Sequence, residues 1–139
     1  MSTHFRQKEE KLEEILEHLA EEVAKGTPIV VEGAKDLKTL IALGVAGRVI
    51  SAKSAGKSLL DLVSEIESTG AREVILLLDF DRRGREWTGR LKQLLERKRI
   101  TPNTVFWHGL ISLVGKEVKD VEGLASYMET LKSKISGNS

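Results

Sequence analysis

The feature of this sequence that most constrains its fold is an unbroken apolar run at residues 74–78, which leads directly into Asp79, Phe80 and Asp81. Such a short apolar run is typical of a buried strand and leaves no face for water. Strands of this kind lie in the middle of parallel sheets, where helices cover both faces. Residues 74–78 therefore predict a central strand whose carboxyl end carries two aspartates.

Weaker strand and helix signals alternate on both sides of this run. β-Branched residues favour strands, and apolar residues at helical spacing favour helices. The expected strands are residues 29–31, 48–51, 74–78 and 104–107. The expected helices begin near Asp36, Leu59, Arg83 and Val121, and residues 109–119 remain unassigned. Because crossovers between parallel strands are right-handed, this order predicts an α/β fold of about four mostly parallel strands flanked by helices.

The N-terminal segment predicts an added helix that packs on this domain. Apolar residues recur there at helical spacing within residues 5–25, and Gly26 follows as a stop signal. The apolar positions are Leu12, Ile15, Leu16, Leu19 and Val23. At 139 residues the chain fits a single core. We expect residues 1–27 to form the packed helix, residues 28–134 the domain and residues 135–139 a flexible tail.

Composition narrows the classes of function. The chain has no cysteine, which excludes disulfides, thiolate metal sites and cysteine nucleophiles. It shows neither a signal-peptide pattern nor an apolar run of the ~20 residues that a membrane span needs, so we expect a cytoplasmic protein without a membrane partner. The net charge is only +1, so attraction to nucleic acid requires a local basic surface.

Acidic side chains follow two of the expected strands. Glu32 comes after the first strand, and Asp79 and Asp81 come after the third. Because the carboxyl ends of parallel strands form the usual site of such sheets, we expect these three carboxylates to converge. Their mutual repulsion is relieved by a proton or by a cation such as Mg²⁺, which prefers oxygen ligands. Taken alone, an Asp-x-Asp pair is better explained by solvated loop acids or by a helix cap than by a metal site.

The two acidic motifs together resemble those of the Toprim family. Glu32-Gly33-x-x-Asp36 and Asp79-x-Asp81-x-x-Gly84 match its strand-ending Glu-Gly and Asp-x-Asp, with the same apolar lead-ins. The resemblance spans roughly residues 28–107 and implies a Rossmann-like Toprim fold. The sequence is similar above all to small stand-alone archaeal Toprim proteins and to the domain of the M5-type ribosomal-RNA maturase. This likeness implies a protein that acts on DNA or RNA.

The resemblance also implies roles for the acids. Glu32 would be a general acid/base or a metal ligand, and Asp79 and Asp81 would hold Mg²⁺ or Mn²⁺ as one or two ions. Topoisomerase members carry a third acid where this chain has Arg83, so a topoisomerase-like metal arrangement is not expected. The lone tyrosine, Tyr127, is expected to pack in the last helix.

Basic residues gather beside the Asp-x-Asp motif. Residues 82–99 hold eight basic and two acidic side chains, a local charge of +6. Residues 51–58 resemble the end of a phosphate loop but begin with Ser51 where the pattern requires glycine, so no nucleotide-binding loop is predicted. The expected nucleic-acid contacts are Lys35, Lys53, Lys57, Arg82, Arg83 and Arg85. Solubility or neutralisation of the acids explains the same charges equally well.

Three functional hypotheses remain open from the sequence. The first is Mg²⁺-dependent cleavage or transfer of phosphodiesters by a nuclease or strand-processing factor. The second is a non-catalytic nucleic-acid binding or assembly module. The third is phosphotransfer unrelated to nucleic acid, because haloacid-dehalogenase-type phosphatases also carry an Asp-x-Asp after a strand, although after their first one. His108 lies at the end of the fourth expected strand and could reach the site, but a lone histidine is more often structural, and neither His4 nor His18 has the spacing of a metal-binding partner for it.

Overall fold

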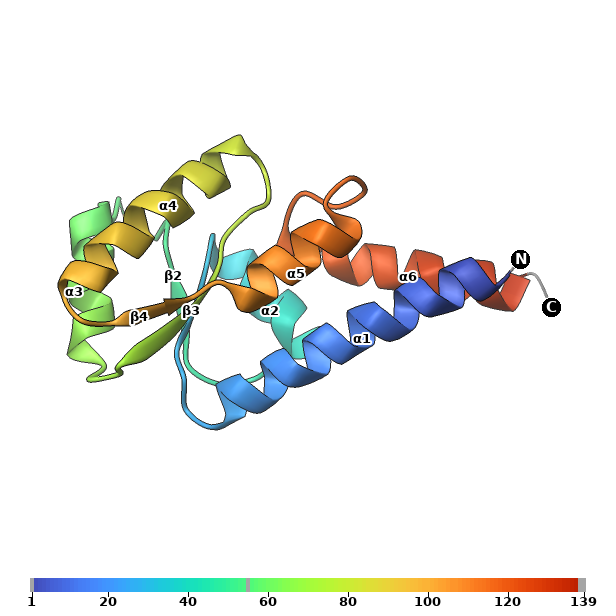
Figure 1. Cartoon of the computed structure of the whole chain (residues 1–139), viewed down its shortest axis with the longest axis horizontal. Helices are drawn as coiled ribbons and strands as arrows, with labels where there is room; N and C mark the ends of the chain where they lie inside the picture. Colours follow the sequence, from blue (N-terminus) through green and yellow to red (C-terminus); the bar gives the residue numbers. More distant parts are fainter. Residues whose placement is uncertain (1, 55, 138–139) are drawn as a thin grey trace.

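The computed structural model describes residues 2–54 and 56–137, and its centre is one sheet of four parallel strands (Figure 1). The strands are β1 (Ile29–Val31), β2 (Val49–Ser51), β3 (Glu73–Leu77) and β4 (Thr101–Asn103), in the spatial order β2-β1-β3-β4. β3 pairs with β1 on one side and β4 on the other. The predicted central position of residues 74–78 is therefore confirmed.

In the described residues six helices flank this sheet, which confirms the predicted α/β class. They are α1 (Ser2–Ala24), α2 (Ala34–Ala42), α3 (Leu59–Ser68), α4 (Arg82–Arg97), α5 (Val105–Val114) and α6 (Val121–Gly137). Gly44 and Gly70 follow α2 and α3 with φ angles of +86° and +74°, the left-handed conformation in which glycine commonly ends a helix. No helix in residues 2–54 and 56–137 combines the length and apolarity needed to cross a bilayer.

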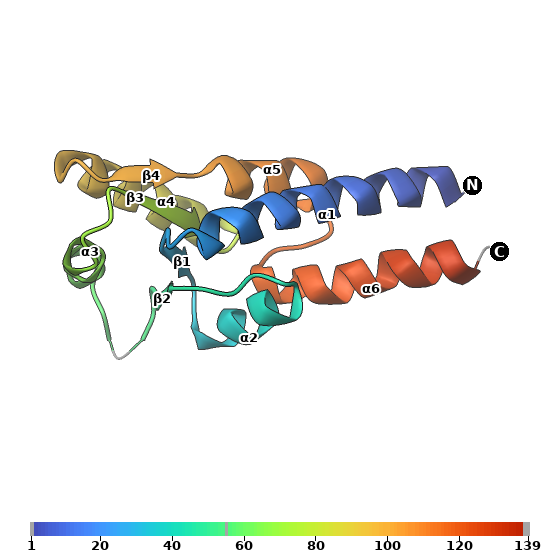
Figure 2. The same ribbon diagram turned by 90° about the horizontal axis from the view of Figure 1, so that it is seen from below.

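The helices form one layer on each face of the sheet (Figure 2). Alternate strand residues point to opposite faces, so Val30 and Leu76 pack with α3 and α4, while Val31 and Ile75 pack with α1, α2, α5 and α6. Every residue from Val74 to Leu78 is inaccessible to solvent. Burial on both faces explains why this run contains no polar residue.

Helices α1 and α6 lie side by side and bring the two ends of the chain to the same end of the molecule (Figures 1 and 2). The buried apolar positions of α1 include Leu12, Leu19 and Val23, as its helical spacing predicted. α6 continues to Gly137, so residues 135–137 of the expected tail are helical. Residues 138 and 139 lie outside the described part of the chain.

The fourth strand was predicted three residues too late. β4 is Thr101–Asn103, whereas residues 105–107 begin α5. Pro102 concealed the strand, since proline lacks a ladder donor and is tolerated only where a strand lies at the edge, as β4 does. Trp107, Leu110 and Val114 of α5 are buried against the sheet instead, and Trp107 Nε1 donates a hydrogen bond of 2.9 Å to the carbonyl of Leu78.

Helix α2 also starts earlier than predicted. It begins at Ala34, and Gly33 occupies the position before its first turn. Asp36 lies inside that turn, where its carboxylate accepts a hydrogen bond of 3.0 Å from the Gly33 amide. Asp36 is therefore bound to the residue that follows Glu32, and so it lies at the carboxyl end of the sheet, where the other acids are.

Candidate metal site

Glu32 is held at the carboxyl end of β1 by the neighbouring strand β3. The parallel register pairs Val31 with Leu77, so Glu32 lies level with the residue that precedes Asp79. One Glu32 oxygen, Oε2, accepts a hydrogen bond of 3.1 Å from the Asp79 amide. The other, Oε1, lies 2.5 Å from Nζ of Lys53. With 8% of its surface exposed, Glu32 is a buried carboxylate whose two oxygens are both engaged.

Asp79 is half-buried among other acids. Burial, followed by the negative charges of Glu32, Asp36, Asp81 and Asp120, raises the pKa of Asp79 to about 7. Among the described residues, none donates a hydrogen bond or an ion pair to its carboxylate. A carboxylate in this position is stabilised either by a proton, which neutralises it, or by a bound cation, which balances its charge.

Asp81 caps the helix that follows it. Its Oδ1 accepts a hydrogen bond of 2.8 Å from the Gly84 amide, as the helix-cap explanation of the motif anticipated. Gly84 cannot carry a side chain, because a β-carbon there would lie 2.1 Å from the carbonyl oxygen of Asp79. The first turn of α4 is thus pressed against Asp79, and this contact holds the two aspartates on one tight turn.

Two further acids belong to this end of the sheet. Asp36 is buried, and burial raises the pKa of its carboxyl against the opposing effect of the Gly33 amide, with Asp120 and Glu32 adding to the rise. Asp120 accepts a hydrogen bond of 2.7 Å from the Gly123 amide at the start of α6. The amide of Phe80 donates to the carbonyl of Lys119 at 2.7 Å, which brings the 119–120 segment to the Asp-x-Asp turn.

No sequence pattern predicts Asp120 as part of this cluster. Its position before a helical stretch and three residues ahead of Gly123 identifies it as a cap for the last helix. Its proximity to Asp79 depends on the path of residues 109–119, which no sequence pattern defined. Asp36 was noted as part of the first motif, and its contact with Gly33 was not anticipated.

These residues fit a hard cation bound through a partial set of protein ligands. No three acidic or histidine side chains in residues 2–54 and 56–137 converge closely enough to form a complete metal-binding group. Mg²⁺ does not need one, because it usually binds through one or two carboxylates and completes its shell with water and substrate phosphates. Asp79 and Asp81 supply oxygens of the required type, and Asp79 has no competing donor among the described residues.

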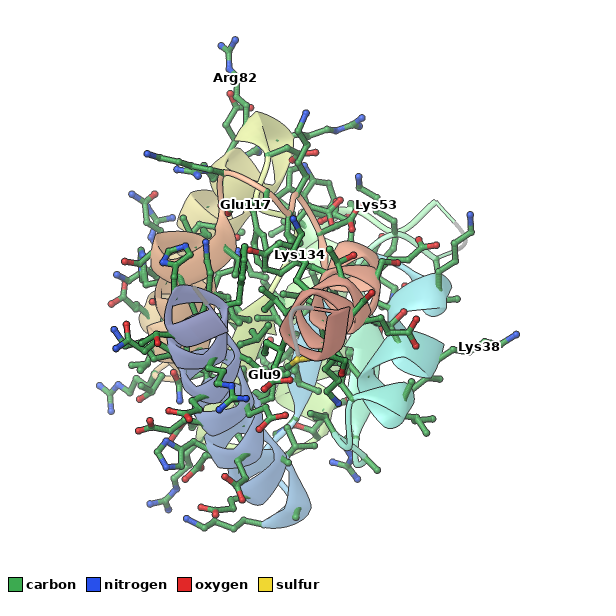
Figure 3. All side chains as sticks on the ribbon, turned by 90° about the vertical axis from the view of Figure 1, so that its right-hand side faces the viewer. Glu9, Lys38, Lys53, Arg82, Glu117 and Lys134 are labelled. Carbon is green, nitrogen blue, oxygen red and sulfur yellow. The ribbon has the colours of Figure 1, made fainter. Side chains whose placement is uncertain are left out.

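The expected nucleic-acid contacts lie at different distances from the acids. Lys53 is paired with Glu32, and Arg85 donates through Nε to the carbonyl of Phe80 at 2.8 Å. Lys57 turns away, since it binds the carbonyl of Ser51 and the carboxylate of Glu65. Lys35, Arg82 and Arg83 are exposed. Figure 3 shows Arg82 extending away from the body of the protein, where its side chain is 94% exposed.

A basic groove continues from Arg85 between α1 and α5. It has a volume of about 570 Å³, and its lining includes His4 and the charged residues Lys8, Arg85, Lys116 and Glu117. Lys8 and Glu117 pair at 3.0 Å, which leaves Arg85 and Lys116 as its unbalanced charges. No sequence pattern predicts this surface, because residues of α1 and of the 115–117 turn meet only in the folded chain.

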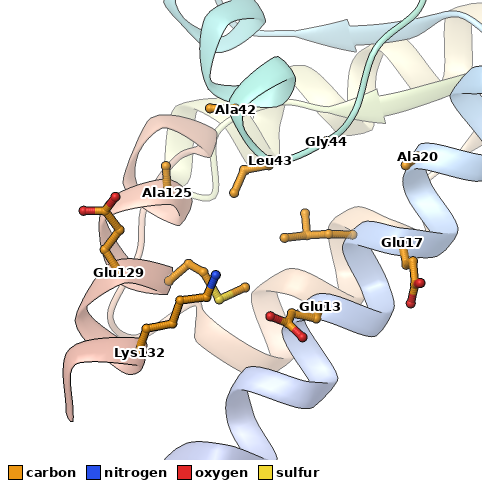
Figure 4. Close-up of a pocket in the computed structure, with 11 residues that line it drawn as sticks. Glu13, Glu17, Ala20, Ala42, Leu43, Gly44, Ala125, Glu129 and Lys132 are labelled. Carbon is orange, nitrogen blue, oxygen red and sulfur yellow. The ribbon is translucent and has the colours of Figure 1, made fainter. Parts of the chain in front are cut away.

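An acidic groove occupies another part of the same helical layer (Figure 4). It measures about 510 Å³ and lies between α1, the end of α2 and α6. Its charged residues are Glu13, Glu17, Glu129 and Lys132, so carboxylates outnumber the one lysine. A groove of this charge disfavours phosphates, and it lies on the face of the sheet opposite α4.

Two residues singled out in the sequence lie apart from the acids. His108 is exposed on α5, and its ring contacts that of Trp107 at a centroid distance of 5.0 Å. It was placed near the site because a strand was expected there, and the helix changes its position. Tyr127 is half-buried in α6 and packs against the core shared with α1.

Comparisons with known proteins agree with the overall fold. Residues 27–106 match the family model of the Toprim domain. The chain is 35% identical over 130 residues to a UPF0292 protein of Methanosarcina acetivorans, covering 94% of this chain and 88% of that protein. A UPF0292 protein of Methanocaldococcus jannaschii is 38% identical over 120 residues, covering 86% and 91%. A solved structure of a protein from Aquifex aeolicus superposes with a TM-score of 0.65 at 26% identity, covering 79% of this chain and 94% of that one.

Proposed function

The chain belongs to the Toprim domain family, and from that premise we propose that it binds Mg²⁺ and cleaves or transfers phosphodiester bonds in nucleic acid. The observation that carries this proposal is the carboxylate of Asp79, which is crowded by four other acids and receives no hydrogen bond or ion pair from the described residues. Toprim domains generally bind Mg²⁺ and are associated with nucleic acid. The family therefore favours this substrate class over phosphotransfer unrelated to nucleic acid.

Asp79 and Asp81 would hold the ion in this proposal. Both lie on the tight turn that Gly84 permits, and Asp81 keeps one oxygen that is not used by the helix cap. A bound divalent ion supplies charge neutralisation at the phosphate and activation of water. The chain itself contributes a fixed position for the two carboxylates, since the β1–β3 register and the Phe80–Lys119 hydrogen bond restrain the turn from both sides.

Glu32 would be the group that moves a proton. It lies beside the Asp79 amide, and it is buried enough that a proton transferred to it is shielded from bulk water. Lys53 would release or share the carboxylate during that step. Glu32→Gln is therefore expected to lower turnover by ~10²-fold, the usual scale for loss of a general acid or base.

The nucleic acid would follow the basic surface that starts at Arg85. This residue is anchored to the carbonyl of Phe80, between the two aspartates, and it lines the groove toward Lys116. Arg83 is exposed beside it in the first turn of α4, where helix N-terminal amides also favour anions. Phosphates bound along this line would reach the acids at one end of the groove.

A non-catalytic binding module is the second candidate, and one observation favours it. Both oxygens of Glu32 are engaged, one by Lys53 and one by the Asp79 amide. An acid–base group that acts on substrate needs a carboxylate oxygen that is free to exchange a proton. In this arrangement both oxygens of Glu32 are occupied by donors. The same metal and basic surface would then serve to hold nucleic acid without turnover.

A cleavage and binding screen separates the two candidates. End-labelled single-stranded, duplex and structured RNA and DNA would be incubated with and without Mg²⁺ or Mn²⁺. We expect metal-dependent cleavage by the wild type, loss of cleavage in Asp79→Asn, and unchanged cleavage in Glu129→Gln, which removes a charge from the acidic groove. Binding without cleavage on every substrate supports the second candidate. The absence of both binding and cleavage on every substrate would contradict both candidates.

A further inference from the structure

Lys53 is attached to Glu32 through both its main chain and its side chain. Beyond β2 the chain keeps its pairing with β1, since Ala52 donates to the carbonyl of Val31 at 2.9 Å and Lys53 donates to that of Glu32 at 3.0 Å. The ammonium then folds back onto Glu32 Oε1 at 2.5 Å. The sheet therefore fixes the backbone of Lys53 beside Glu32, so the side chain starts within reach of the carboxylate.

The ammonium neutralises a carboxylate that needs a cation. Glu32 is 8% exposed, and a buried carboxylate is stable only when a cation or several donors accompany it. In the described part of the chain, no other lysine or arginine forms an ion pair with the acidic cluster. The cluster comprises Glu32, Asp36, Asp79, Asp81 and Asp120. Lys53 is thus the cation that the fold itself supplies to this end of the sheet.

We propose that Lys53 takes the place of a second divalent ion at Glu32, so that the site binds a single divalent ion, at Asp79 and Asp81. The inference rests on the proposed metal-dependent function and specifies its stoichiometry. Two-ion phosphodiester chemistry places one cation on each side of the reacting phosphate. Here the tethered ammonium would occupy the Glu32 side, and a bound ion would occupy the side of the aspartates.

The arrangement of the remaining donors supports one ion. The described residues contain no group of three acids or histidines that could hold a metal, which leaves the aspartate turn as the place for an ion with a partly aqueous shell. A second ion near Glu32 would have to displace an ammonium that is already in contact with Oε1. It would also approach Oε2, which accepts the Asp79 amide.

Counting bound Mn²⁺ ions tests this inference without relying on activity. Mn²⁺ would be titrated into the wild type and into Lys53→Met, which keeps the side-chain length and removes the charge, with detection by calorimetry and by electron paramagnetic resonance of free Mn²⁺. We expect one ion in the wild type and two in Lys53→Met. The matched control is Lys38→Met, since Lys38 is an exposed lysine of α2 that points away from the molecule (Figure 3), and it should keep one ion.

A double variant shows whether the added ion depends on Glu32. Lys53→Met/Glu32→Gln should return to one ion, because the carboxylate that the second ion needs is gone. Two ions in the wild type, or one ion in Lys53→Met with circular dichroism unchanged, would overturn the inference and leave the proposed function standing. A wild type that binds no Mn²⁺ at millimolar concentration would instead contradict the proposed metal site itself.

Discussion

At the scale of single residues, the carboxylate of Asp79 sets the electrostatics of this end of the sheet. Burial and four neighbouring acids raise its pKa to about 7, so the folded protein holds a proton that the unfolded chain releases near pH 4. A site of this kind lowers the free energy of unfolding of the metal-free protein and at the same time provides a place for a cation. The consequence can be measured in the metal-free protein.

The first prediction is that Asp79→Asn stabilises the metal-free protein at alkaline pH. Below pH 4 the carboxyl is protonated in both states. Between about pH 4 and pH 7 the unfolded chain loses this proton while the folded protein keeps it, so the free energy of unfolding of the wild type falls through that window. Urea denaturation in the presence of EDTA should therefore show the variant gaining stability over the wild type at pH 8 relative to pH 4. A variant with no relative gain at pH 8 would contradict the assigned environment of Asp79.

The second prediction concerns the contact between Gly84 and Asp79. In Gly84→Ala the new β-carbon would meet the Asp79 carbonyl oxygen at 2.1 Å, so the turn must move, at a cost of about 2–3 kcal/mol. Both the free energy of unfolding and the affinity for Mn²⁺ should fall. The control is Gly89→Ala in the same helix, where a β-carbon meets nothing within 4 Å and alanine should stabilise the helix by ~1 kcal/mol. Equal stability of the two variants would show that the turn tolerates the contact.

At the scale of elements, the start of α4 connects the acids to the basic groove. Asp81 caps the helix, Gly84 packs on Asp79, and Arg85 reaches back to the carbonyl of Phe80. These three contacts come from one turn of helix. The same turn therefore positions a carboxylate for a cation and a guanidinium for a phosphate.

The third prediction is that Arg85 contributes to the salt dependence of nucleic-acid binding. Each phosphate contact adds ~0.9 to the magnitude of the slope of log affinity against log salt on duplex DNA, and ~0.7 on single strands. Arg85→Gln should flatten the slope by about one such contact, measured by fluorescence anisotropy from low to moderate salt. Lys132→Gln removes an equal charge from the acidic groove and should leave the slope unchanged. An unchanged slope in Arg85→Gln together with a flatter slope in Lys132→Gln would place the binding surface at the acidic groove instead.

Most elements could be predicted from the sequence because their local pattern and their packing agree. The residues of the apolar run at 74–78 and the regularly spaced apolar residues of α1 and α6 are buried in the structure, as their patterns predict. The edge strand β4 was predicted three residues too late, since Pro102 contradicts strand propensity and the apolar residues that follow belong to helix α5. The acids of the two motifs were found through strand ends, whereas Asp120 and the groove at Arg85 depend on contacts between distant segments.

At the scale of the whole molecule, opposite charges are separated on a protein whose net charge is +1. α4 carries its basic residues on one face of the sheet, and the groove rimmed by Glu13, Glu17 and Glu129 lies on the other. The acidic cluster lies at the strand ends between these two faces. Phosphates are therefore drawn toward α4 and the groove at Arg85 and Lys116, and away from the acidic groove between α1 and α6, which orients a nucleic acid relative to the candidate metal site.

The central claim is that a divalent ion binds at Asp79 and Asp81. Calorimetric titration of Mn²⁺ or Mg²⁺ into the wild type and into Asp79→Asn/Asp81→Asn tests it most directly, with Glu129→Gln as the control for loss of a negative charge elsewhere. We expect saturable binding by the wild type and the control, and none by the double variant while its circular dichroism stays that of a folded protein. Equal binding by the double variant and the wild type would contradict it.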